Sequence, residues 1–81
     1  MLTLYRKNGC PYCAKVLTAA SELGITFIDK NIADPEVVDE LIALGGKRQV
    51  PFLVDDARGV SLYESADIIE YLRAHHTPSE A

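Results

Sequence analysis

The sequence is short of the residues on which several classes of protein depend. It has two cysteines, two histidines and no tryptophan, and its eight Lys and Arg against twelve Asp and Glu give a net charge of −4. Nucleic-acid binding needs a basic surface, so this charge disfavours it. No apolar run has the length of a signal peptide or a membrane span. We therefore expect a cytoplasmic location and no contact with a membrane.

The length of the chain fits one small domain over residues 1–81. Its hydrophobic fraction of 48% and charged fraction of 25% are ordinary for a globular protein. We find no repeats, low-complexity segments or linkers. A chain of this length buries about two-thirds of the surface that its unfolded form exposes, which is enough for a modest core. We expect the domain to act as a monomer.

Both cysteines lie in one short stretch, Cys10-Pro11-Tyr12-Cys13, where an alternating apolar segment gives way to a helical pattern. A thiol at the start of a helix lies beside free N–H groups and the positive end of the helix dipole, and both favour its thiolate. The second thiol lies on the same helical face and can attack a mixed disulfide made by the first. The spacing therefore predicts a two-step redox cycle.

Three other interpretations of the cysteine pair are weaker. A zinc site needs two further ligands, and His75 and His76 are adjacent in the tail, which is poor ligand spacing, so we expect no metal site. A structural disulfide closing so small a ring adds little stability. Two chance core thiols are at odds with Pro11, because a proline at the first helical position is typical of a helix start. In a reducing compartment a close pair is more often catalytic than structural.

The pattern along the chain predicts an α/β fold of four strands and three helices in the order βαβαββα. We expect strands at 2–6, 25–29, 50–54 and 60–63, and helices at 11–23, at 35 to about 45, and from 65 onward, followed by a frayed tail at 77–81. The first two strands should be parallel and the last two antiparallel, in one mixed sheet flanked by helices. A Cys-x-x-Cys pair in such a strand–helix–strand unit is typical of the thioredoxin fold. The thiols then lie at a rim where loops gather.

Several positions within these elements are also predicted. The helix from residue 35 should bury Val37, Val38, Leu41 and Ile42. Ser65 is a good cap for the last helix. Three tyrosines, Tyr5, Tyr63 and Tyr71, are expected to serve packing only.

Lys7-x-x-Cys10-Pro11-Tyr12-Cys13, with Val50-Pro51 and Glu64-Ser65 further on, resembles a dithiol glutaredoxin over nearly the whole chain. The resemblance implies a glutathione-dependent oxidoreductase that reduces protein disulfides and glutathione mixed disulfides. Cys10 would be the nucleophile and Cys13 the resolving thiol. Glutathione would be the co-substrate, and no cofactor would be tightly bound.

The resemblance also implies a glutathione site. Lys7 would help bind glutathione and stabilise the thiolate. Pro51 would be cis and would turn the backbone of Val50 towards the peptide. The alternative for Pro51 is a proline that only starts an edge strand. Gln49 stands where glutaredoxins usually have threonine, and it can still form hydrogen bonds.

Glu64-Ser65 departs from the familiar glutaredoxin pattern and is similar to the N-terminal domain of glutathione transferases. Both families use this position for the γ-glutamyl end of glutathione. The Ser65 hydroxyl and nearby N–H groups would take its carboxylate, and Glu64 its ammonium group. The alternative is that Ser65 only caps the helix.

Two further residues are weaker candidates. Arg48 could meet the glycyl carboxylate of glutathione, although a solvated loop charge is the simpler interpretation. Tyr12 could pack against the bound peptide, or it could be a half-exposed aromatic residue on the first helical turn.

Other functions share these features. A redoxin driven by thioredoxin reductase, which feeds ribonucleotide reductase, has the same fold and thiol pair, but Glu64-Ser65 disfavours it. A glutathione-binding module or a transferase fragment would lack the helical domain that supplies a second substrate pocket, so we expect no conjugating activity. A dimer sharing an iron–sulfur cluster through Cys10 is the remaining alternative. Cluster carriers of this family usually have one active-site cysteine.

Overall fold

The structure is a computed structural model that describes residues 2–75, so the predicted tail at 77–81 lies outside the described residues. The elements occur in the predicted order βαβαββα. They are β1 (Leu2–Arg6), α1 (Pro11–Glu22), β2 (Ile28–Asn31), α2 (Pro35–Gly45), β3 (Phe52–Asp55), β4 (Val60–Leu62) and α3 (Ser65–His75). Within this part of the chain, no helix combines the length and hydropathy needed to cross a membrane.

The four strands form one mixed sheet in the order β2-β1-β3-β4. β1 pairs in parallel with β2, where Thr3 lies opposite Ile28, and antiparallel with β3, where Tyr5 lies opposite Phe52. β4 pairs antiparallel with β3. The predicted thioredoxin fold and the predicted strand directions are confirmed.

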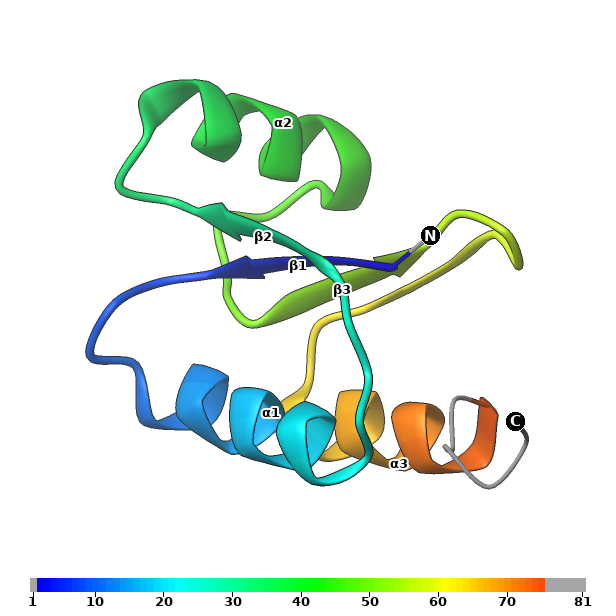
Figure 1. Ribbon diagram of the computed structural model, residues 1–81. Helices are drawn as coiled ribbons and strands as arrows, with labels where there is room; N and C mark the ends of the chain where they lie inside the picture. The colour runs from blue at the N-terminus through cyan, green and yellow to red at the C-terminus, as the bar shows by residue number, and fades with distance from the viewer. Residues whose placement is uncertain (1, 76–81) are drawn as a thin grey trace.

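Helices cover both faces of the sheet, with α1 and α3 on one face and α2 on the other (Figure 1). The alternation of side chains along β1 explains the two cores, because successive residues point to opposite faces. Leu2 and Leu4 pack in one cluster with buried residues of α1, β3 and α3: Val16, Ala20, Leu53, Ile68 and Leu72. Tyr5 packs in the second cluster with Ile32, Leu41 and Phe52.

Helix α2 buries fewer apolar side chains than predicted. Leu41 is fully buried, Val37 and Val38 are half-buried, and Ile42 is 42% exposed, so the prediction that Ile42 faces the core was wrong. The physical reason is that one short helix meets this face of the sheet and buries only a narrow stripe. Polar contacts of Glu40 also hold α2 against the sheet. Lys30 Nζ lies 2.8 Å from Glu40 Oε1, and the Tyr5 hydroxyl donates to the same carboxylate.

Strand β2 begins later than predicted, at Ile28 instead of residue 25. The residues after α1 are used to end that helix. Gly24 has φ of 70° and its N–H donates to the Ser21 carbonyl at 3.1 Å, while the Ile25 N–H donates to the Ala20 carbonyl at 2.9 Å. This is the Schellman arrangement, which satisfies carbonyls that the last helical turn leaves free. Strand pairing starts only after it.

Strand β3 also begins later than predicted, at Phe52 instead of residue 50. The Val50–Pro51 peptide bond is cis and bends the chain before the strand. The prediction of a strand over 50–54 was therefore wrong at its start, and the cis prediction is confirmed. The last predicted residues of α1 and β4, Leu23 and Tyr63, lie just outside those elements.

Candidate active site

Cys10 is the N-cap residue of α1, and the sequence around it explains why a helix starts there. Pro11 occupies the first helical position, where its fixed φ suits the helix and its missing N–H costs nothing. Cys10 itself is extended, with φ of −84° and ψ of 115°. Its Sγ accepts a hydrogen bond from the Cys13 N–H at 3.3 Å. The thiol thus takes the role that a Ser or Asp side chain usually has at a helix start.

The two thiols have different surroundings. Burial opposes ionisation of Cys10, but hydrogen bonds from the Cys13 thiol and from the N–H groups of Cys13 and Tyr12, with the charge of Lys7, bring its pKa below the ordinary value. Cys13 is 1% exposed, and burial raises its pKa to about 11 despite a hydrogen bond from the Lys7 N–H. Cys10 is therefore the thiol that ionises more readily, and Cys13 is the proton-bearing partner.

A cavity of about 400 Å³ gathers most of the residues predicted from the sequence. It is lined by Tyr12, Gln49, Val50, Pro51, Tyr63, Glu64 and Ser65. Six of these seven were predicted as glutathione-binding residues. They come from three separate parts of the chain, and the middle part contains the cis Val50–Pro51 bond.

Tyr63 is the residue of this cavity that the sequence analysis missed. It was expected to serve packing only, and it does stack on Phe52 with ring centroids 4.4 Å apart. Its hydroxyl also donates to the Lys47 carbonyl at 3.0 Å and accepts from the Lys47 N–H at 3.2 Å. The only feature of the sequence that pointed to a place for Tyr63 in this cavity was its position directly before Glu64.

Ser65 is not the cap of α3, so that prediction was wrong. The Ile68 N–H donates to the Glu64 carbonyl at 2.8 Å, which makes Glu64 the N-cap residue and Ser65 the first helical residue. The hydroxyl of Ser65 therefore lies at the cavity beside the first turn, where free N–H groups favour an anion.

Lys7 lies outside this cavity, on the loop between β1 and α1. It lines a second cavity of about 280 Å³ together with Arg48, Asn8 and Asn31. It also lines a third cavity of about 280 Å³ that includes Arg6, Cys10 and Cys13. Lys7 and Arg48 are thus brought together, as a site for a carboxylate requires. Among residues 2–75, no three His, Cys, Asp or Glu side chains are grouped as metal ligands.

Replacing Lys7 by glutamine should raise the pKa of Cys10, because the ammonium group of Lys7 stabilises the thiolate. In a Cys13→Ser background, alkylation of Cys10 at neutral pH should slow about two- to threefold, since a surface charge is partly screened. In both proteins the rate should fall as the pH falls through the pKa of Cys10. Lys15→Gln is the matched control, because Lys15 lies over the Tyr12 ring instead. An unchanged alkylation rate in Lys7→Gln would contradict the role of Lys7.

The fold and the site define a thioredoxin-fold protein with a cysteine thiol at the start of its first helix. A family model described as the N-terminal domain of glutathione S-transferase matches residues 4–80. The chain belongs to this family. No curated protein sequence matches the chain.

Solved structures similar to this chain agree with that assignment. A glutathione S-transferase from Methylobacillus flagellatus with GSH bound is 36% identical, with a TM-score of 0.72, over 96% of this chain and 38% of that one. A delta-class glutathione transferase from Nilaparvata lugens is 30% identical, with a TM-score of 0.80, over 95% and 37%. The chain therefore spans little more than a third of the length of these transferases.

A thioredoxin-like protein is 19% identical, with a TM-score of 0.78, over 91% of this chain and 96% of that one, which shows the fold alone. The likeness to the transferase domain that Glu64-Ser65 indicated is confirmed by the family match. The comparisons do not show the more specific assignment to dithiol glutaredoxins.

Proposed function

We propose that this protein binds glutathione and acts as a glutathione-dependent thiol–disulfide oxidoreductase through Cys10 and Cys13. The observation that carries the proposal is the asymmetry of the two thiols. Cys10 is half-buried at the N-cap of α1 with a lowered pKa, whereas Cys13 is buried and keeps its proton. This is the arrangement that a nucleophilic and a resolving thiol need.

Glutathione binding is supported by the family match and by the residues of the main cavity. The peptide would pair with the backbone of Val50, which precedes β3 and is left outside the sheet. Its γ-glutamyl carboxylate would lie at the first turn of α3 beside Ser65, and its ammonium group at Glu64. Lys7 and Arg48, which line one cavity, would take the glycyl carboxylate.

The reaction follows from these positions. The Cys10 thiolate attacks the glutathione sulfur of a mixed disulfide, so a Cys10–glutathione disulfide forms and the target thiolate leaves and takes up a proton. The thiolate of a second glutathione then attacks the glutathione sulfur, which yields oxidised glutathione and restores the Cys10 thiolate. In the dithiol route Cys13 loses its proton, attacks the Cys10 sulfur and expels glutathione. Two further glutathiones then reduce the Cys10–Cys13 disulfide. The substrates would be protein disulfides and glutathionylated proteins in a reducing compartment.

Transfer of glutathione to an electrophile is the second candidate, and the family match and transferase neighbours favour it. The cavity with Ser65 and Val50 would hold glutathione in both cases. The difference lies in the thiol that reacts. In a transferase the glutathione sulfur attacks the electrophile and no cysteine of the protein changes its bonding. In the oxidoreductase, Cys10 forms the covalent intermediate.

Two assays on the unmodified protein separate the candidates. The first follows NADPH consumption by glutathione reductase while glutathione reduces a small mixed disulfide, and the second follows conjugation of glutathione to an aryl halide. We expect turnover in the first assay and little above the uncatalysed rate in the second. The reverse result would replace the oxidoreductase by a transferase. Turnover with thioredoxin reductase in place of glutathione would instead indicate a redoxin.

A further inference from the structure

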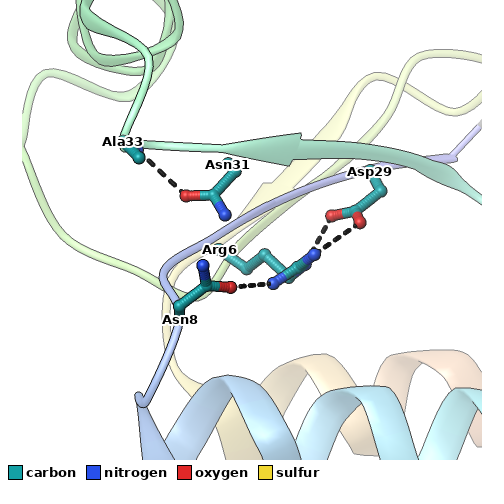
Figure 2. A network of polar contacts seen from close by, with 5 residues as sticks. All are labelled: Arg6, Asn8, Asp29, Asn31 and Ala33. Carbon is teal, nitrogen blue, oxygen red and sulfur yellow. Dashed lines mark hydrogen bonds and ion pairs between the residues drawn. The ribbon is translucent and has the colours of Figure 1, made fainter.

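Arg6, the last residue of β1, holds a network of polar contacts on the face of the sheet that α1 covers. Its guanidinium donates to both carboxylate oxygens of Asp29, through Nε at 2.6 Å and Nη2 at 2.8 Å, and through Nη1 to Asn8 Oδ1 at 2.9 Å. Figure 2 shows Arg6 between Asp29 of β2 and Asn8 of the loop before α1. A planar guanidinium bound at three points is fixed in direction as well as in position.

This fixed cation lies beside the buried thiol. Arg6 and Cys13 line the same cavity of about 280 Å³, which Cys10 also lines. Arg6 directly precedes Lys7, whose N–H donates to the Cys13 sulfur. The groups that act on Cys13 are Arg6 from β1, Cys10, and the Lys7 N–H from the loop, and Asp29 from β2 is bound to Arg6. Arg6 favours the Cys13 thiolate, and Asp29 offsets that charge.

We propose that the Arg6–Asp29 pair is an electrostatic device that acts on the resolving thiol. Arg6 stabilises the Cys13 thiolate, and Asp29 limits this stabilisation. The inference rests on the proposed function for its consequence, which is the rate of the resolving step.

The device fits the sequence of events at the two thiols. Burial is the main cause that raises the pKa of Cys13, and while Cys10 is free its hydrogen bond and its charge add two contributions. Once Cys10 is bound to glutathione, both contributions disappear and the guanidinium of Arg6 remains. Cys13 then ionises more readily, loses its proton to solvent, and attacks the Cys10 sulfur while glutathione leaves as a thiolate. Burial keeps Cys13 protonated in the resting protein, and the ion pair with Asp29 limits how far Arg6 opposes that effect.

Two substitutions with opposite expected effects test the pair. In a Cys10→Ser background, where Cys13 is the single thiol, Arg6→Met should move the thiolate absorbance transition to higher pH. Asp29→Asn should move it to lower pH, because it removes the anion and leaves the cation. A purely structural role would move both variants in the same direction. Lys30→Met is the matched control, since Lys30 lies on the neighbouring strand, binds Glu40 on the opposite face, and changes the net charge as Arg6→Met does.

The second readout is the release of glutathione from Cys10 in the protein with both cysteines. A displacement of about one pH unit changes the thiolate fraction about tenfold, and the opposing change in nucleophilicity leaves a net change of about threefold. We expect release to be about threefold slower in Arg6→Met and about threefold faster in Asp29→Asn at neutral pH.

The two readouts separate the inference from the function it rests on. The titration of Cys13 needs no turnover, so it stays informative if the protein proves to be a transferase. Transitions that move together in Arg6→Met and Asp29→Asn, or that do not move, would overturn the pair as an electrostatic device. Opposite shifts without any release of glutathione would keep the device and overturn the resolving role of Cys13, and with it the dithiol route of the proposed function.

Discussion

Serine in place of Cys10 should lower glutathione-dependent reduction of a small mixed disulfide by at least about a hundredfold, because the covalent intermediate has no other atom on which to form. Cys13 is no substitute, since it is buried and its pKa is raised to about 11. The measurement is the rate of NADPH consumption coupled to glutathione reductase. Full activity in Cys10→Ser would remove the basis for the oxidoreductase.

Cys13→Ser and Cys13→Ala are the controls for this prediction. Both should keep most of the activity on a small mixed disulfide, because the monothiol route needs only Cys10 and a second glutathione. Serine retains a hydroxyl that donates to the Cys10 sulfur as the Cys13 thiol does, whereas alanine does not. The pKa of Cys10 should therefore be higher in Cys13→Ala than in Cys13→Ser. Equal values would show that this donor contributes nothing.

Alanine in place of Gly45 should destabilise the protein by about 1–3 kcal/mol and weaken glutathione binding, because there is no space for a side chain at the end of α2. A Cβ at this position would overlap the hydroxyl of Tyr63 and lie 2.7 Å from Tyr63 Cζ and 3.0 Å from Phe52 Cζ. The ring of Tyr63 must then move, and both of its hydrogen bonds to Lys47 break. Tyr63 lines the cavity proposed to bind glutathione, so the KM for glutathione should rise together with the loss of stability.

Two variants show whether Tyr63 transmits this effect. Gly46→Ala places a side chain where nothing lies within 4 Å, although φ of 84° strains it. It should cost about 1–2 kcal/mol without raising the KM. Tyr63→Leu should remove most of the additional cost of Gly45→Ala in a double-mutant cycle, since the overlapping hydroxyl is gone. Additive losses of free energy of unfolding in that cycle would rule out the contact as the cause.

The order of the elements could be predicted from the sequence because each one carries a local signal. Pro11 and Pro35 start helices, Gly24 and Gly46 end them, and apolar residues recur at helical spacing between these positions. Most residues of the main cavity could be predicted because they lie in or beside short motifs: Tyr12 between the two cysteines, Gln49 before Val50-Pro51, and Glu64-Ser65.

What could not be predicted depends on contacts between distant parts of the chain. The start of β2 depends on how many residues end α1, and Ile25 is taken up by that task. The exposure of Ile42 depends on how much of α2 the sheet covers. The close approach of Tyr63 to Gly45 and the ion pair of Arg6 with Asp29 each join residues that are far apart in the sequence. Hydrophobic periodicity contains no information on either pairing.

The central position of β1 has a consequence for the protein during its synthesis. β1 pairs with β2 on one edge and with β3 on the other, and Tyr5 pairs with Phe52 across more than half of the chain. A growing chain exposes Cys10 and Cys13 before β3 and α3 exist, when neither thiol is buried. The burial that raises the pKa of Cys13 is thus absent from the nascent polypeptide. Oxidants that reach the ribosome would discriminate less between the two sulfurs, and the full difference arises only when Cys13 becomes buried in the folded protein.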